Sequence, residues 1–169
     1  MRFIKTIFGL AVILILAGCA TPERGSKFRS YDGPEVTFIV IEKAARKLYL
    51  FSGSDVLKTY DVGLGFAPVG HKQFEGDGKT PEGLYYIDRR NPRSRYHMSI
   101  GLSYPNKADI AYAKAQGKEP GGDIFIHGRS GYRGVNKGDW TWGCVAVTDE
   151  EIEEIYAMVK NGTPIRIKP

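Results

Sequence analysis

The chain contains few residues that could hold a disulfide or a metal: two cysteines and three histidines among 169 residues. With Cys19 and Cys144 alone, it cannot build the disulfide framework of small exported domains. No Cys-x-x-Cys or His-x-x-x-His spacing occurs, so we expect no metal and no other cofactor. The alternative is a zinc site that adds His71 or His97 to a cysteine and a third histidine.

A hydrophobic run long enough to span a membrane is also missing. The apolar stretch at residues 7–16 falls short of the roughly 20 residues that a bilayer requires. Arg2 and Lys5 precede it and Cys19 ends it, which is typical of a signal peptide over residues 1–18. The letters LAGC resemble the lipobox of bacterial lipoproteins. The resemblance implies lipidation of Cys19 and a periplasmic protein anchored to a membrane, expected to be the outer one; a secreted protein with a free cysteine is the alternative.

Strong charge of one sign is absent as well. The formal net charge is +5, and removal of Arg2 and Lys5 with the signal peptide leaves +3. No cluster interleaves basic and aromatic residues, so we expect no nucleic-acid partner. The length suits one hydrophobic core. We expect a lipidated cysteine and a flexible polar tether at residues 19–33 and one catalytic domain at residues 34–169, present as a monomer.

What the sequence does contain is a series of short β-rich runs. Strands are expected at residues 36–42, 47–51, 56–65, 84–90, 123–128, 143–148 and 163–169. One helix is expected at residues 106–117, and a second from Thr148, where Glu151 completes a capping box. The glycine-rich residues 66–83 form either a long ordered loop or a flap. The fold class is therefore mostly β with two short helices (α+β), the second helix packing behind the Cys144 strand.

The candidate catalytic residues stand where two of these strands end or begin. His127 closes the run DIFIHG, and Cys144 follows Gly143 in the run GCVAVT. We expect these strands to pair and to bring the thiol within hydrogen-bond reach of the imidazole. Only about 3% of an unperturbed thiol is ionised at neutral pH, so a cysteine nucleophile needs a neighbouring base to take its proton. The Gly128 carbonyl would orient the imidazole, and the amides of Gly143 and Cys144 would form an oxyanion hole. The pattern indicates acyl transfer; a packed thiol beside an unrelated histidine is the alternative.

These residues resemble the signature of a known family. His127-Gly128, a spacer, and the letters TWGC are similar to the HG and [ST]HGC motifs of the L,D-transpeptidase catalytic domain (YkuD-like). The runs VGHKQFEGDGKTPEG and DWTWGCVAVT look closest to the YafK-like branch. The resemblance implies the family's β-rich fold and action on the diaminopimelate–D-Ala bond of peptidoglycan stem peptides. It also implies Cys144 as nucleophile, His127 as base, the Gly128 carbonyl as orienting group and sensitivity to carbapenems.

Two positions depart from the family pattern, Trp142 in place of a histidine and Ala146 in place of an arginine or asparagine. The expected substrate-binding residues are His71, Arg129, Thr141 and Trp142. Three of them carry alternatives. His71 either compensates for the missing polar contact or fastens its loop; Arg129 meets the diaminopimelate carboxylate or is a solvated charge. Trp142 stacks on a stem peptide or glycan ring, or packs the base of the site.

The leading interpretation is a periplasmic lipoprotein that forms a Cys144 thioester with a stem peptide. An acceptor amine would give a 3-3 crosslink or attach an envelope lipoprotein. Water as acceptor would make the protein a carboxypeptidase, or an amidase that detaches a lipoprotein bound to peptidoglycan. A third interpretation is a peptidoglycan-binding lipoprotein without catalysis. The sequence does not separate these outcomes.

Overall fold

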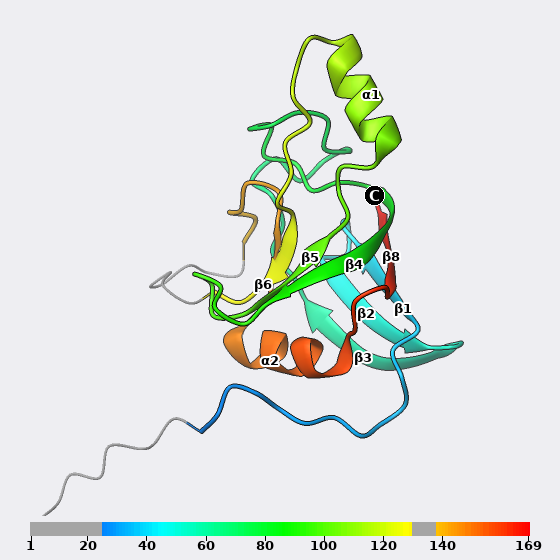
Figure 1. Ribbon diagram of the computed structural model, residues 1–169, viewed down its shortest axis with the longest axis vertical. Coiled ribbons are helices and arrows are strands. Elements are labelled where there is room, and N and C mark those ends of the chain that lie inside the picture. The colour runs from blue at the N-terminus through cyan, green and yellow to red at the C-terminus, as the bar shows by residue number, and fades with distance from the viewer. Residues whose placement is uncertain (1–24, 130–137) are drawn as a thin grey trace, which may run out of the picture.

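A computed structural model describes residues 25–129 and 138–169. The predicted signal peptide, Cys19 and most of the spacer between the two family motifs lie outside the described residues. No described helix is long and apolar enough to cross a membrane. The elements, shown in Figure 1, are β1 (Phe38–Glu42), β2 (Lys47–Ser52), β3 (Asp55–Asp61), β4 (Gly83–Asn91), β5 (Ser99–Leu102), α1 (Lys107–Ala115), β6 (Phe125–His127), β7 (Val145–Ala146), α2 (Asp149–Met158) and β8 (Pro164–Lys168).

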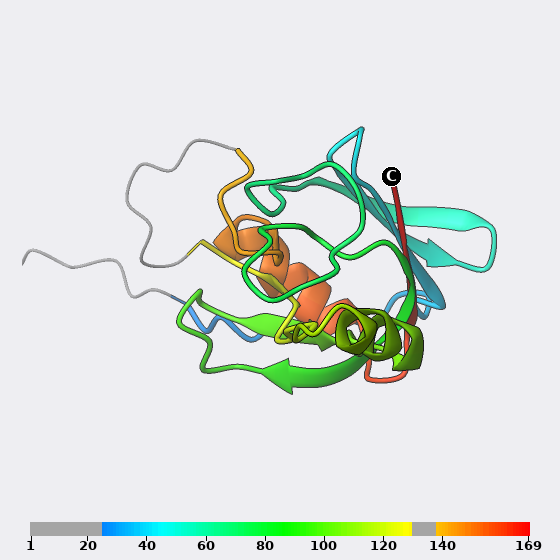
Figure 2. The same ribbon diagram turned by 90° about the horizontal axis from the view of Figure 1, so that it is seen from above.

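The strands form one curled sheet in the order β3-β2-β1-β8-β4-β5-β6-β7. β1 pairs with β8, and β6 with β7, in parallel; the other pairs are antiparallel. The chain just after β3 also meets β7, because Gly63 and Ala146 exchange two backbone hydrogen bonds of 2.9 and 2.8 Å. The sheet thereby closes on itself. Seen from above in Figure 2, β4 lies on one side of the molecule and β2 and β3 on the other.

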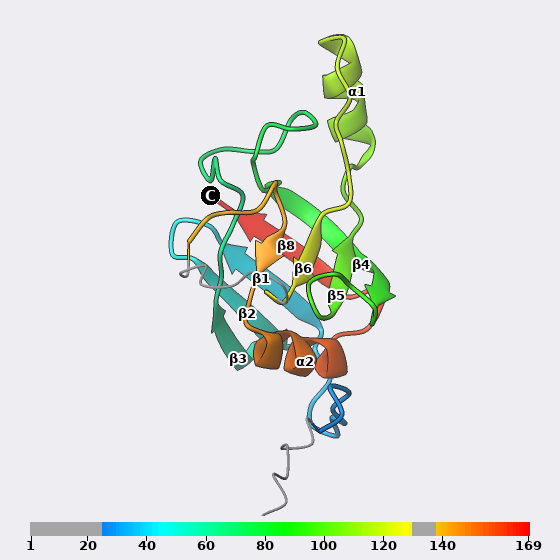
Figure 3. The same ribbon diagram turned by 90° about the vertical axis from the view of Figure 1, so that its left-hand side faces the viewer.

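The core fills the inside of this curl. Alternate residues of β1 and β2, among them Ile39, Ile41 and Leu48, are fully buried, as the two-residue period of a strand predicts. α2 closes one end of the core with Ile152 and Ile155, both fully buried. Each such side chain contributes about 1.5–3 kcal/mol through burial. In Figures 1 and 3 the other helix, α1, stands at the opposite end of the molecule.

Both helices begin where the sequence predicts. The Thr148 hydroxyl accepts from the Glu151 amide at 3.2 Å, and the Glu151 carboxylate accepts from the Thr148 amide at 2.8 Å. Asn106 and Asp109 form the same reciprocal cap on α1. Because the α2 cap follows Ala146 by two residues, the Cys144 strand is short. The helix N-terminus therefore packs directly behind the Cys144 strand.

The glycine-rich segment is an ordered loop rather than a flap. Asp77 holds it together by accepting the amides of Gln73 and Phe74 at 2.8 and 3.0 Å and by pairing with the buried Lys72 at 2.9 Å. The buried ammonium of Lys43 pairs with Glu82 at 2.7 Å and donates to two carbonyls of the same loop. A buried charge without partners is costly, so these contacts fix the loop against the sheet.

The described part of the tether, residues 25–33, lies against the domain. Arg29 pairs with Glu153 and Glu154 of α2 at 2.9 and 3.2 Å. Lys27 donates to the carbonyls of Pro92 and His97 at 2.6 and 3.3 Å. The composition of this segment predicts a flexible chain, whereas these contacts dock it on the domain. Its ionic partners lie far away in the sequence, so the local composition does not reveal them. Exposed ion pairs of this kind contribute about 0–1 kcal/mol each.

Candidate active site

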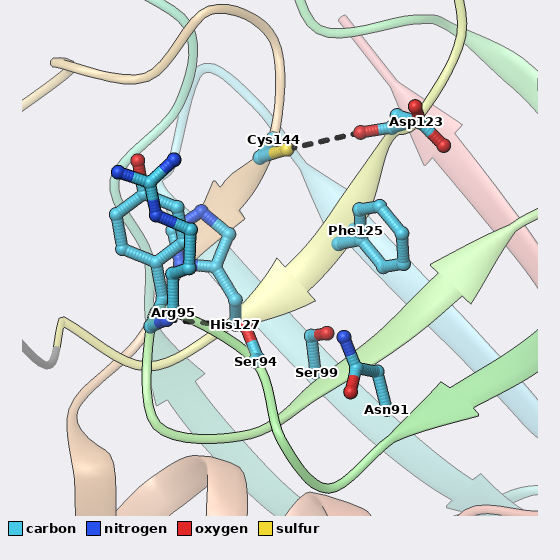
Figure 4. Close-up of a pocket in the computed structure, with 9 residues that line it drawn as sticks. Asn91, Ser94, Arg95, Ser99, Asp123, Phe125, His127 and Cys144 are labelled. Carbon is cyan, nitrogen blue, oxygen red and sulfur yellow. Dashed lines mark hydrogen bonds between the residues drawn. The ribbon is translucent and has the colours of Figure 1, made fainter.

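The parallel pairing of β6 and β7 brings the two motifs together. Ile126 lies opposite Val145 and His127 opposite Ala146, so Cys144 sits one residue before the paired segment. His127 and Cys144 line one open cavity of about 480 Å³, shown in Figure 4. The predicted pairing of the two strands is therefore present, and it places the imidazole and the thiol on the wall of the same pocket.

The imidazole is buried and its tautomer is fixed. Its Nδ1 lies 2.6 Å from the Gly128 carbonyl oxygen, and a carbonyl only accepts, so Nδ1 carries the proton and Nε2 is free to take one. Burial lowers the pKa of His127, with the charge of Arg129 acting in the same direction and the carbonyl contact opposing both. The ring is therefore neutral at neutral pH. This contact agrees with the orienting role that the resemblance implies for Gly128.

Two aromatic residues that the sequence analysis missed hold the imidazole in place. Tyr96 stacks on His127 with ring centroids 4.4 Å apart and an interplanar angle of 25°. Trp140 packs edge-on at 5.8 Å and 68°, and its ring also lies 5.8 Å from that of Tyr96. Stacked aromatic contacts of this kind contribute about 0.5–1.5 kcal/mol and fix the ring plane. Trp140 belongs to the quoted DWTWGC run, whereas Tyr96 carries no motif that could have identified it.

The thiol is held differently. The Sγ of Cys144 donates to the main-chain carbonyl of Asp123 at 3.4 Å, the contact drawn as a dashed line in Figure 4. The expected hydrogen bond from thiol to imidazole is therefore replaced, because a thiol has one hydrogen and Asp123, with φ of +53°, turns its carbonyl toward the sulfur. Burial raises the pKa of Cys144, against a lowering contact from the Phe125 backbone. The resting pair is a neutral thiol and a neutral imidazole.

The turn before Cys144 is built by Thr141 and Gly143. The Thr141 hydroxyl donates to the Cys144 carbonyl at 2.7 Å and accepts from the Gly143 amide at 3.1 Å. Gly143 has φ of +128°, and a Cβ there would lie 2.6 Å from the Lys79 carbonyl oxygen, so only glycine fits. This corrects two expectations. Thr141 is 3% exposed and shapes the turn instead of reaching the pocket. The Gly143 amide is engaged by Thr141, so of the two amides expected to form an oxyanion hole the Cys144 amide is the remaining candidate.

Trp142 points outward. Its side chain is 70% exposed, and it packs edge-on against the exposed Phe66 with ring centroids 4.9 Å apart. The alternative in which it packs the base of the site is therefore excluded. Trp142 lines a second cavity, of about 460 Å³, which shares Asp123 with the cavity of Cys144.

Two other predicted contacts lie away from the pocket. His71 donates from Nε2 to Asp109 at 3.0 Å and accepts the Glu82 amide on Nδ1 at 2.9 Å, so it fastens the loop to α1. Arg129 stands two residues after His127, and its amide donates to Asp149 at 3.0 Å at the start of α2. Neither residue is part of the wall around Cys144. Their proposed substrate contacts have no support from these positions.

The rim of the cavity comes from a segment that the sequence analysis passed over. Asn91 at the end of β4, and Ser94 and Arg95 in the turn between β4 and β5, face the pocket in Figure 4. Arg95 is exposed and brings a positive charge to the rim. The described residues hold no group of three side chains suited to a metal ion. The other two histidines contact carboxylates away from the pocket: His71 contacts Asp109 at 3.0 Å and His97 contacts Glu153 at 2.8 Å.

Comparison with known proteins shows that the sequence similarity extends over nearly the whole domain. The sequence profile of the L,D-transpeptidase catalytic domain, YkuD, matches residues 36–167. YafK of Escherichia coli (strain K12) is 34% identical over 122 residues, which cover 70% of this chain and 44% of that protein. The chain thus spans less than half the length of this curated relative.

Solved structures show the same fold. Pgp2 of Campylobacter jejuni, a helical cell shape determining protein, superposes with a TM-score of 0.61 at 25% identity, covering 82% of this chain and 49% of that one. Bd1075 of Bdellovibrio bacteriovorus gives 0.59 at 25% identity, covering 83% and 50%. An L,D-transpeptidase from Mycobacterium smegmatis, at 13% identity and a TM-score of 0.54 over 79% and 59%, shares the fold. The predicted mostly β class with two helices is confirmed.

Proposed function

Because the chain belongs to the YkuD family of L,D-transpeptidase catalytic domains, we propose that it is a cysteine-dependent acyltransferase acting on peptidoglycan stem peptides. The observation that carries the proposal is the shared cavity. His127, with its tautomer fixed by Gly128, and Cys144 line one open pocket. A nucleophile and a base on the same wall are what acyl transfer requires.

The geometry supports a two-step reaction. Rotation of the thiol away from the Asp123 carbonyl turns its hydrogen toward Nε2 of His127, which takes the proton as sulfur attacks the substrate carbonyl. The Cys144 amide faces the oxyanion that forms. Collapse breaks the peptide bond; the leaving amine takes the proton from His127, and a thioester remains on Cys144. An acceptor amine or water then attacks the thioester and restores the thiol.

The rim suits an anionic donor peptide. Stem peptides present the carboxylates of diaminopimelate and of the terminal D-alanine, and the exposed Arg95 brings a cation to the pocket rim. Ala146, where the family pattern has a polar side chain, is 1% exposed and has no side chain able to contact substrate. We therefore propose that Arg95, on the β4–β5 turn, binds the substrate carboxylate in place of a polar side chain at position 146.

Hydrolysis is the second candidate activity. The site lacks the polar side chains that the family shows at the positions of Trp142 and Ala146, and Trp142 instead points away into solvent. A site that offers few contacts to an acceptor amine leaves water as the competing nucleophile. The protein would then act as a carboxypeptidase, or as an amidase that detaches a bound lipoprotein.

We also propose that the protein is a periplasmic lipoprotein held to the outer membrane by lipid on Cys19. The LAGC run and the short apolar segment before it support this proposal. A fatty-acid probe should label the wild-type chain and not Cys19→Ser. Labelling that survives the substitution would overturn lipidation at this residue.

Muropeptide analysis tests the activity. Purified protein is incubated with sacculi, with and without covalently bound lipoprotein, beside a matched Cys144→Ala variant. New 3-3 dimers, or newly attached protein, support transfer; loss of D-alanine or of bound lipoprotein supports hydrolysis. A muropeptide profile identical to that of Cys144→Ala would contradict both activities and favour the binding protein.

A further inference from the structure

We propose that Trp142 and Phe66 form a stacking platform for a sugar ring of the glycan strand, so that the enzyme binds the polysaccharide beside the peptide that it processes. The inference rests on the proposed peptidoglycan substrate and deepens it. We call these two residues the aromatic ledge. They are among the exposed large hydrophobic side chains of the described chain, 70% and 48% exposed.

The rings of the ledge pack edge-on at 88°, and Trp142 remains 70% exposed beside Phe66, whose ring lies over Gly78. Burial of an aromatic side chain stabilises a fold, so an adjacent exposed pair marks a binding surface more often than a packing one. Trp142 also directly precedes Gly143 in the catalytic turn. The ledge is therefore fixed in position relative to Cys144.

A second cavity connects the ledge to the catalytic pocket. It is lined by Trp142, Glu75 and the main chain of Gly121 and Gly122, and it shares Asp123 with the Cys144 cavity. Glu75 and Asp123 are both exposed; one oxygen of Asp123 pairs with Arg89 at 3.1 Å, and its side chain is still 89% exposed. Carboxylates at the edge of an aromatic surface can accept the hydroxyl hydrogens of a sugar whose C–H face lies on the ring.

The chemistry of the polymer selects the occupant. Stem peptides are built mainly from alanine, a glutamate and diaminopimelate, none of which has a large apolar face. The sugar rings do present such a face, with hydroxyls around its edge. An aromatic surface flanked by carboxylates and continuous with the peptide pocket matches the sugar and not the peptide.

Direct binding can be read from Trp142 itself. The chain has two tryptophans, so Trp140→Phe leaves Trp142 as the single reporter. We expect its fluorescence to change saturably when a peptide-free probe, a β-1,4-linked N-acetylglucosamine tetramer, is added. Phe66→Ala in this background should weaken binding about fivefold, whereas Tyr86→Ala, an exposed aromatic on β4, should not. The absence of a saturable change, or equal affinity in Phe66→Ala, would overturn the platform.

Turnover gives an independent readout in the full-length protein. A stem peptide attached to its disaccharide and the same peptide without sugar are compared as substrates. Wild type should prefer the sugar-bearing form, Trp142→Ala should lose that preference, and Trp142→Tyr should retain most of it. Equal loss on both substrates would show that Trp142 acts through the catalytic turn and would contradict the proposal. If wild type processes neither substrate, the proposed enzymatic function fails, while the fluorescence titration still decides the sugar site.

Discussion

The proposed base and the proposed nucleophile of this site are held in different ways. His127 is 2% exposed, bonded to Gly128, and enclosed by Tyr96 and Trp140. Cys144 is half-buried, and its sulfur donates a long hydrogen bond, of 3.4 Å, to the Asp123 carbonyl. The comparison indicates that the protein preorganises the base and leaves the thiol free to rotate. Catalysis then needs one side-chain rotation and no change in the fold.

Loss of the preorganised base should have the largest effect. In His127→Gln no side chain can take the thiol proton, and general-base catalysis contributes about 10²–10⁴-fold. We expect kcat/KM on a stem peptide to fall in that range, measured by mass spectrometry of the products. Cys144→Ala, which lacks the nucleophile, sets the background. A His127→Gln variant with near wild-type activity would remove the imidazole from the mechanism.

Loss of the Thr141 hydroxyl should disturb the nucleophile side without touching the base. Thr141→Val keeps the shape but removes the donor to the Cys144 carbonyl and the acceptor for the Gly143 amide. Leaving a buried amide unsatisfied costs about 1–3 kcal/mol, and we expect this loss in the free energy of unfolding by urea titration. Thr141→Ser retains the hydroxyl and is the matched control. Equal stability of all three proteins would contradict the role given to the turn.

Removal of Tyr96 tests the enclosure of the base. Tyr96→Ala lets water reach the imidazole, so the pKa of His127, which burial holds below its ordinary value, should rise. The base is active when neutral, so the acidic limb of the kcat/KM profile should move to higher pH, with kcat lowered about tenfold by the less fixed ring. Tyr86→Ala is the control for aromatic loss. An unmoved acidic limb would mean that Tyr96 does not desolvate His127.

The smallest and most specific prediction concerns the resting thiol. Burial raises the pKa of Cys144, so iodoacetamide should alkylate it faster as pH increases, with the midpoint above the ordinary cysteine value. Rates are measured by loss of free thiol between neutral and alkaline pH. A fast, pH-independent rate from acid to neutral pH would reveal a preformed thiolate–imidazolium pair. It would contradict the contrast between a fixed imidazole and a thiol that is neutral at rest.

The comparison also separates what the sequence could predict from what it could not. The caps at Asn106 and Thr148 depend on residues three apart, so local spacing identifies them. The pairing of the His127 strand with the Cys144 strand follows from two strand-like runs and the family motifs. Tyr96 reaches the imidazole only through the register of β5 against β6, which no local pattern encodes. The turn of the Asp123 carbonyl toward the thiol depends on a left-handed backbone that composition does not reveal.

The glycine before the nucleophile shows the same limit. The sequence assigns the Gly143 amide to an oxyanion hole; in the structure Gly143 lies against the Lys79 carbonyl, which leaves no room for a Cβ. The Gly143 amide, however, donates to the Thr141 hydroxyl. Sequence spacing alone cannot tell whether this amide binds a side chain or an oxyanion. Local rules predict where glycine is needed, and tertiary contacts decide what its amide does.

The most direct test of the account is the covalent state of Cys144 during turnover. Protein mixed with a stem peptide is quenched in acid, and its intact mass and peptide map are measured. We expect an acyl adduct on Cys144 in wild type, lost in Cys144→Ala and strongly reduced in His127→Gln. Product formation by wild type without any adduct on Cys144, or with the adduct on another residue, would contradict the central claim that this thiol carries the acyl group.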